Sequence, residues 1–173
     1  MRWILIGLGV LVLLIALVAL VGALLPRGHV AARSAVYRQP PEEVFATIRG
    51  FAAYPEWRAD ATKVEILPSV DGKERFRETG SYGAITFAVE EVHAPRRMVV
   101  RIADEGLPFG GTWTYELTPV SEGTRLTITE RGEVHNVFFR FLSRFVFSQH
   151  ATIDKLLQAL GRKFGETVTP GPA

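Results

Sequence analysis

The sequence predicts an α+β domain that is preceded by one membrane-spanning helix. Three features lead to this prediction: an uncharged apolar run near the amino terminus, a central series of short strand-like segments, and a long amphipathic run before the carboxy terminus. An antiparallel sheet with one apolar face needs a helix to cover that face. We therefore expect a seven-stranded curved antiparallel sheet around a long carboxy-terminal helix.

Every residue from 3 to 25 is apolar or glycine. A helix of this length measures roughly 35 Å at about 1.5 Å per residue, which is enough to cross a hydrocarbon core of about 30 Å. A cleaved signal peptide is the alternative, although its apolar region usually has about 7–15 residues. We interpret residues 1–28 as an uncleaved, single-pass membrane anchor with its flank. Arginines on both sides of the run leave open which side of the membrane the domain faces.

Within the anchor, Ala19 and Ala23 form a pair of small residues one helical turn apart. Such pairs let two membrane-spanning helices approach closely. The pair therefore favours a weak homodimer through the anchor.

The net charge of +2 belongs to the anchor and its flank. The chain has 20 basic and 18 acidic residues, and Arg2 and Arg27 both precede residue 29, so the remainder has 20 − 2 = 18 basic and 18 acidic residues. A domain that binds nucleic acid usually carries a basic excess, so we expect no nucleic-acid partner. The chain has no cysteine, which excludes disulfides and thiolate metal sites.

The first part of the domain predicts one strand and two short helices. Residues 30–38 alternate loosely between apolar and polar side chains and precede two prolines, which is typical of a strand and its end. Pro41 suits the first turn of a helix, where no N–H is needed, and Gly50 ends that helix. Aromatic residues at helical spacing then indicate a second short helix over residues 51–57.

Residues 63–134 are typical of six antiparallel strands separated by turns. The Asp71-Gly72 pair between two strand-like runs is the strongest hairpin signal. Further breaks fall at residues 80–83, 94–95, 107–111 and 121–123. Together with the first strand, these segments give seven strands, enough for a strongly curved sheet.

The carboxy-terminal region predicts one long helix. Asn136 precedes an apolar-periodic run, where its side chain can accept a hydrogen bond from a free amide of the first turn. The run from Val137 to Phe164 places apolar side chains on one broad face. We expect residues 167–173 (TVTPGPA) to be a disordered tail.

The order of these blocks resembles a known family. The resemblance rests on four stretches: PEEVFATIRGFAAYPEW, LPFGGTWTYELTP, TRLTITERGEV and FFRFLSRFVFSQHATIDKLLQALGRKFGE. They are similar to the SRPBCC superfamily of START-like proteins and, within it, to the polyketide cyclase/dehydratase-like branch. The resemblance delimits the domain as residues 29–166 and implies a helix-grip fold with a hydrophobic cavity between sheet and helix. Members include lipid carriers, plant ligand binders and aromatic cyclases, so the family does not fix the activity.

Large aromatic side chains are the candidates to line this cavity, because they can enclose an apolar ligand. Ordinary core packing is the alternative for each of them. The candidates are Trp57, Phe87, Trp113, Tyr115, Phe138, Phe141 and Phe145. Gln149 falls near the centre of the apolar arc of the long helix, where it could hydrogen-bond a ligand head group or a buried backbone carbonyl.

Glu130 is the candidate catalytic residue. Leu126, Ile128 and Glu130 alternate onto one face of their strand. A buried carboxylate there would have a raised pKa and could act as a general acid or base. The alternatives are that Glu130 turns to solvent at the strand end, or that it pairs with an arginine such as Arg101.

The sequence predicts neither a metal site nor a cofactor. No phosphate-binding loop or nucleophile elbow is present. The four histidines lack the spacing of metal ligands: His29, His93, His135 and His150.

An aromatic residue, Phe147, projects from the polar side of the predicted long helix beside Arg140 and Arg144. This combination suits an anionic membrane surface or a protein partner. A single exposed aromatic residue without a function is the alternative.

Three functions remain open after these steps. The first is a membrane-anchored binding or carrier domain for a hydrophobic small molecule, such as a lipid, a quinone or a polyketide-like compound. The second is a cyclase or dehydratase that uses Glu130, although the sequence shows no matched pair of acid and base groups. The third is a protein-interaction module whose interior is filled by side chains. We expect the first of these.

Overall fold

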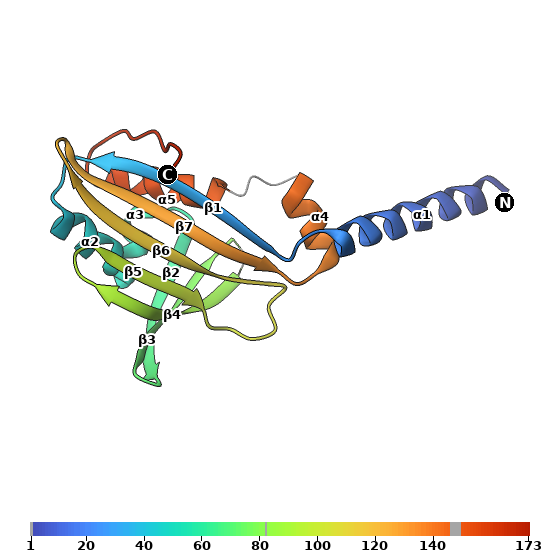
Figure 1. Ribbon diagram of the computed structural model, residues 1–173. Coiled ribbons are helices and arrows are strands. Elements are labelled where there is room, and N and C mark those ends of the chain that lie inside the picture. Colours follow the sequence, from blue (N-terminus) through green and yellow to red (C-terminus); the bar gives the residue numbers. More distant parts are fainter. Residues whose placement is uncertain (1, 82, 146–149) are drawn as a thin grey trace.

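Seven antiparallel strands form one sheet in the computed structural model, in which residues 2–81, 83–145 and 150–173 are described (Figure 1). The strand order across the sheet is β1-β7-β6-β5-β4-β3-β2. The strands are β1 (Gly28–Tyr37), β2 (Ala61–Val70), β3 (Lys73–Gly80), β4 (Gly83–His93), β5 (Arg97–Ile102), β6 (Phe109–Val120) and β7 (Gly123–Val134). The predicted α+β fold with a seven-stranded antiparallel sheet is confirmed.

Short turns set the order of the sheet, because each strand from β2 to β6 pairs with the strand that follows it in the chain. The predicted hairpin at Asp71-Gly72 joins β2 to β3, with φ values of 51° and 74° at its two residues. Aspartate and glycine tolerate this left-handed conformation better than most residues. Only β1 pairs with a strand distant in sequence, β7, so β1 and β2 are the two edges.

Six helical segments accompany the sheet in the part of the chain that the structure describes. They are α1 (Arg2–Leu24), α2 (Pro41–Arg49), the 3₁₀ turn η1 (Phe51–Ala53), α3 (Tyr54–Trp57), α4 (Val137–Phe145) and α5 (Ala151–Lys163). The segments after β1 match the predicted pair of short helices. The Tyr54 hydroxyl donates to the carbonyl oxygen of Ile48 at 2.6 Å and thereby ties α3 to α2.

Helix α5 closes the apolar side of the sheet. Its residues Ile153, Leu157 and Leu160 are fully buried, and each such side chain contributes about 1.5–3 kcal/mol through burial. The Tyr37 hydroxyl of β1 donates to the carbonyl oxygen of Leu157 at 2.8 Å. These contacts fix α5 against β1 and leave its other apolar residues facing the centre of the sheet.

The structure differs from the sequence prediction at residues 137–164, because the helices described there, α4 and α5, pack on different parts of the protein and not together along the sheet. Helix α5 packs against β1, whereas α4 lies beside the end of α1 (Figure 1). The predicted cap is confirmed, since Asn136 Oδ1 accepts from the backbone N–H groups of Phe138 and Phe139 at 2.9 and 3.2 Å. The spacing of apolar residues in the sequence indicates a helix, but it does not indicate which part of the protein that helix packs against.

Residues 167–173, which the sequence predicts to be disordered, lie against β1. Gly171 and Ser34 exchange two backbone hydrogen bonds of 3.0 and 2.9 Å. Arg33 Nη2 also donates to the carbonyl oxygen of Pro170 at 2.9 Å. Because β1 is an edge strand with unpaired backbone groups, an extended segment without a pattern of its own can still dock there.

Candidate functional site

A cavity of about 90 Å³ lies between the inner face of the sheet and helices α3 and α5. This volume is smaller than that of pockets for drug-sized ligands, roughly 300–1,000 Å³, and than a protein cavity of about 150 Å³ that binds benzene. The cavity therefore holds a small group as it stands, and a larger ligand must displace side chains. Its lining consists of Tyr54, Arg58, Phe76, Glu78, Phe87, Val100, Trp113, Tyr115, Ile128, Thr152, Ile153 and Leu156.

Aromatic rings form a continuous row along the cavity. Phe51 stacks on Phe76 with ring centroids 4.0 Å apart, and Phe76 stacks on Phe87 at 5.2 Å. Phe87 then meets Trp113 edge to face at 5.9 Å. Pairs of this kind contribute about 0.5–1.5 kcal/mol beyond the burial of their area. The row gives the cavity a wall on which a flat or apolar ligand can pack.

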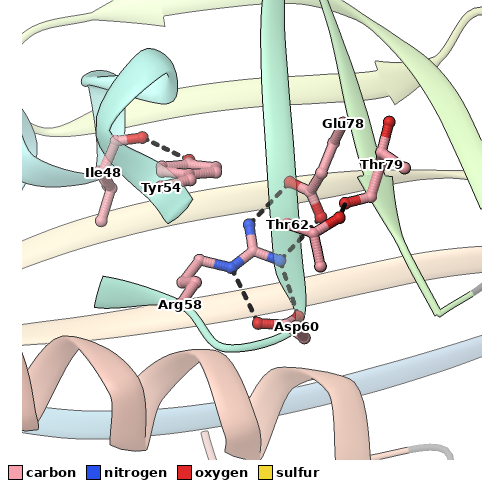
Figure 2. Close-up of polar contacts among 7 residues, drawn as sticks. All are labelled: Ile48, Tyr54, Arg58, Asp60, Thr62, Glu78 and Thr79. Atoms are coloured by element: carbon pink, nitrogen blue, oxygen red, sulfur yellow. Dashed lines mark hydrogen bonds and ion pairs between the residues drawn. The ribbon is translucent and has the colours of Figure 1, made fainter. Parts of the chain in front are cut away.

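Opposite charges meet at the lining residues Arg58 and Glu78, and Figure 2 shows their contacts. Arg58 follows α3 and is 7% exposed. Its Nη1 and Nη2 atoms donate to the two carboxylate oxygens of Glu78, each at 2.9 Å. Its Nε and Nη2 atoms donate to Asp60 at 3.3 and 2.8 Å, and the guanidinium carbon lies 4.7 Å from the centre of the Tyr54 ring. One buried cation thus serves two carboxylates.

The two carboxylates respond differently to this environment. Burial raises the pKa of Glu78, and the charge and hydrogen bonds of Arg58 offset this only in part. Burial acts in the same direction on Asp60, but its hydrogen bond and charge interaction with Arg58 prevail and lower its pKa. Burial also raises the pKa of Tyr115 to about 12. At neutral pH the cavity therefore presents a protonated tyrosine and a carboxylate that takes up a proton more readily than usual.

Glu130, the predicted catalytic residue, lies behind Trp113 and outside the cavity lining. Its Oε2 atom accepts from the indole N–H of Trp113 at 3.1 Å, and its Oε1 atom lies 3.3 Å from Nε2 of His29. The side chain is 14% exposed, so it is not turned to solvent. The partner considered from the sequence, Arg101, pairs with Glu90 at 2.7 Å instead. These contacts suit a residue that orients the indole, and a catalytic role for Glu130 stays a prediction.

The structure brings together only some of the other predicted cavity residues. Phe87, Trp113 and Tyr115 line the cavity. Trp57 packs edge to face on Tyr54 at 5.3 Å, just outside the lining. Gln149 and Phe147 lie outside the described residues. Three predicted residues are on α4, which does not contribute to the cavity: Phe138, Phe141 and Phe145.

The sequence reasoning missed Arg58 and Glu78. A signal for Glu78 was present, because Phe76 and Glu78 share one face of their strand in the same way as Ile128 and Glu130 do. Arg58 has no comparable local signal. Its burial depends on the packing of α3 against β2 and on its pairing with Glu78 of β3, and both strands are formed by later residues.

A second concavity, of about 310 Å³, lies between η1 and the β2–β3 hairpin. It is an open surface groove beside the ion pair of Arg49 and Glu74. We regard the smaller internal cavity as the candidate site, because it combines enclosed aromatic surface with buried charges. Within the described parts of the chain, no group of histidine, aspartate and glutamate side chains is placed to hold a metal ion.

Fold and cavity together define a helix-grip domain in which the sheet and α5 enclose a partly charged interior. The chain belongs to the family described as "Polyketide cyclase / dehydrase and lipid transport", whose profile matches residues 29–165. The resemblance to the SRPBCC superfamily and its polyketide cyclase-like branch is thereby confirmed. A search of curated proteins found no match.

Solved structures with the same fold come from proteins of different kinds. A START superfamily protein from Mycobacterium smegmatis has a TM-score of 0.61 and 17% identity over 78% of this chain and 96% of its own. An aromatase/cyclase from Streptomyces sp. R1128 has a TM-score of 0.59 and 14% identity over 77% and 91%. Norcoclaurine synthase from Thalictrum flavum has a TM-score of 0.62 and 13% identity over 80% and 87%. At these identities the likeness concerns the fold alone.

Proposed function

We propose that this chain is a membrane-anchored domain that binds or carries an apolar or amphipathic small molecule in its internal cavity. The family description includes lipid transport, which supports a binding role. Helix α1 supports the anchor, because it is long and apolar enough to cross a membrane and is not buried in the domain. Tethering would restrict the search for ligand to the lipid surface. A lipid, a quinone and a polyketide-like compound all fit this description.

The observation that carries the proposal is the meeting of an aromatic wall with the buried charge of Arg58 and its carboxylate partners, Asp60 and Glu78. Charged groups do not help an apolar interior to pack, and their burial has a large desolvation free energy. The family relationship and the cavity favour a ligand whose apolar body packs on the aromatic wall and whose polar group lies near these charged side chains. A ligand larger than the present 90 Å³ has to displace side chains of the lining.

The charge pattern also indicates the polar group of the ligand. Arg58 already donates to both carboxylates, whereas the carboxylate oxygens keep free lone pairs. A third carboxylate would add negative charge beside Glu78 and Asp60. Among these ligands, the cluster therefore favours a neutral one that donates a hydrogen bond, such as an alcohol or a phenol, over a quinone, whose carbonyl oxygens only accept.

Calorimetric titration of the full chain in detergent with 2-naphthol and 2-naphthoate tests this proposal. These two flat aromatic probes differ in their polar group. We expect 2-naphthol to bind at least about tenfold more tightly, a difference of roughly 1.4 kcal/mol. Val100→Trp, which fills the cavity, should abolish binding, and Ile66→Trp on the exposed surface should not. If Val100→Trp and Ile66→Trp bound 2-naphthol equally well, the ligand would have to bind outside this cavity.

Catalysis of a cyclase or dehydratase type is the second candidate, and Glu78 is the observation in its favour. Its carboxyl lines the cavity and has a raised pKa through burial, as a general acid or base requires. Tyr115, in the same lining, can donate a proton or a hydrogen bond. If the domain is an enzyme, Glu78→Gln should abolish turnover while the protein still binds 2-naphthol. Unchanged turnover would remove Glu78 from the chemistry.

A further inference from the structure

Helix α4 presents its apolar side outward and buries an arginine. At about 100° per residue, Phe138, Phe141, Leu142 and Phe145 share one side of the helix. Phe138 is 41% exposed and Phe145 is 61% exposed. Arg140, in contrast, is buried. A surface helix of a soluble domain normally shows the opposite arrangement, with its apolar stripe facing the core.

The same helix is attached to the last turns of α1. A Cβ atom at Gly22 would overlap the carbonyl oxygen of Val137, so the two helices are in direct backbone contact there. Arg140 Nη1 donates to the carbonyl oxygen of Leu25, and Nη2 donates to that of His135, both at 3.2 Å. The arginine thus satisfies a carbonyl at the end of α1 that has no partner within the helix. These contacts hold α4 at the depth of the carboxy-terminal end of α1.

We infer that α4 lies in the interfacial layer of the membrane that α1 crosses, with Phe138, Phe139 and Phe145 inserted among the lipids. This inference rests on the proposed membrane anchor. About 20 residues of helix span the hydrocarbon core, so the last turn of α1, around Gly22, lies near the boundary between hydrocarbon and head groups. Amphipathic helices bury their apolar side about 5–10 Å into that boundary.

Four side chains on α4 fit this location. Phe139 is 46% exposed, so three of the four phenylalanines of α4 are exposed: Phe138, Phe139 and Phe145. Arg144 is exposed one turn after Arg140, where its guanidinium can meet lipid phosphates. Continuity with α1 favours lipid over a protein as the cover, because an apolar surface fixed beside a spanning helix already faces the bilayer.

Single-cysteine labelling can measure the depth of α4, since the chain has no cysteine of its own. We suggest the full chain with Phe145→Cys, labelled with an environment-sensitive nitrobenzoxadiazole dye, in vesicles of phosphatidylcholine and phosphatidylglycerol. Leu13→Cys reports on the middle of α1, and Ile66→Cys reports on an exposed strand. Lipids with spin labels at shallow or deep positions serve as quenchers.

We expect the dye at residue 145 to show blue-shifted emission and quenching by the shallow spin label. The dye at residue 13 should be quenched by the deep label, and the dye at residue 66 by neither. Water-like emission at residue 145 together with deep quenching at residue 13 would overturn the inference about α4 and leave the anchor intact. A blue shift at residue 145 without lipid quenching would mean that protein covers α4, which also overturns it. Absence of quenching at residue 13 would overturn the anchor itself.

Discussion

Arg58 and Glu78 form a two-point ion pair in the wall of the cavity, with both Nη atoms 2.9 Å from the carboxylate oxygens. The planar guanidinium matches the carboxylate at two points, which the single ammonium of a lysine cannot do. The pair joins the end of α3 to β3 and places a fixed charge pattern beside the aromatic row. We therefore expect both the stability of the domain and the ligand selectivity of the cavity to depend on this pair.

Removal of Arg58 should destabilise the protein strongly. Arg58→Ala leaves two carboxylates without their cation, and breaking a buried pair typically costs about 3–5 kcal/mol. Arg97→Ala is the matched control, because Arg97 also serves two carboxylates, Glu91 and Glu116, but at the surface. We expect it to cost about 1 kcal/mol or less. Urea unfolding in detergent, followed by tryptophan fluorescence, measures both, and equal losses would contradict the importance of the buried pair.

The two carboxylates that share Arg58 should give opposite pH dependences. The pKa of Asp60 is lowered in the folded protein, so its contribution is present above about pH 3.8 and is lost as the pH falls through the folded value. The pKa of Glu78 is raised by burial, so its contribution is present below about pH 4.5 and is lost as the pH rises through the folded value.

Substitution of each carboxylate separates these contributions. Glu78→Gln should make the loss of stability on acidification steeper above pH 4.5, because the favourable proton uptake is removed. Asp60→Asn should make the loss below pH 3.8 shallower. The midpoint of thermal unfolding between about pH 3 and 7 measures both slopes. If both substitutions changed the pH dependence of the midpoint in the same direction, the pKa values of Glu78 and Asp60 would not be shifted in opposite directions.

Substitutions of Glu130 can distinguish orientation of Trp113 from catalysis. Glu130→Gln keeps an oxygen that accepts from the indole, whereas Glu130→Leu leaves the N–H without its partner. An unsatisfied buried donor costs about 1–3 kcal/mol. We therefore expect 2-naphthol affinity to survive in Glu130→Gln and to fall in Glu130→Leu, as measured by calorimetry. Loss of all turnover in Glu130→Gln with unchanged binding would instead support the catalytic prediction.

Bulk at Gly22 should separate α1 from α4. Gly22→Leu places side-chain atoms where the carbonyl group of Val137 lies, and overpacking of this kind costs about 1–3 kcal/mol. Gly9→Leu is the control, since no atom lies within 4 Å of a Cβ at that position. In detergent, trypsin should cleave faster after Arg140 and Arg144 in Gly22→Leu than in Gly9→Leu. Equal cleavage rates would show that the contact does not hold α4.

Local signals in the sequence predicted the strands and the helix starts. Asp71-Gly72 and Asn136 act through their own backbone and side-chain chemistry, so their effect does not depend on distant residues. The separate positions of α4 and α5 were not predicted, because α4 is held by its contacts at Gly22 and Arg140, and no periodicity encodes those contacts. The docking of residues 167–173 likewise depends on the free edge of β1.

Residues of the candidate site could be predicted from the sequence only where the alternation along a single strand determines which face a side chain is on. Phe87, Trp113 and Tyr115 lie on strands whose inner faces follow from alternation. Glu78 obeys the same rule and could have been found with it. Arg58 could not, since a charged residue after a short helix is normally exposed, and its burial is explained by its pairing with Asp60 and with Glu78 on a strand formed later in the chain.

Native mass spectrometry of the full chain, extracted in detergent from cell membranes, tests the binding role most directly. Val100→Trp removes the space of the cavity, and Ile66→Trp adds the same side chain on the exposed surface. We predict that the unmodified chain and Ile66→Trp retain one small molecule of defined mass, and that Val100→Trp retains none. Absence of any bound molecule from the unmodified chain, or equal retention by Val100→Trp, would contradict the proposal that the cavity holds the ligand.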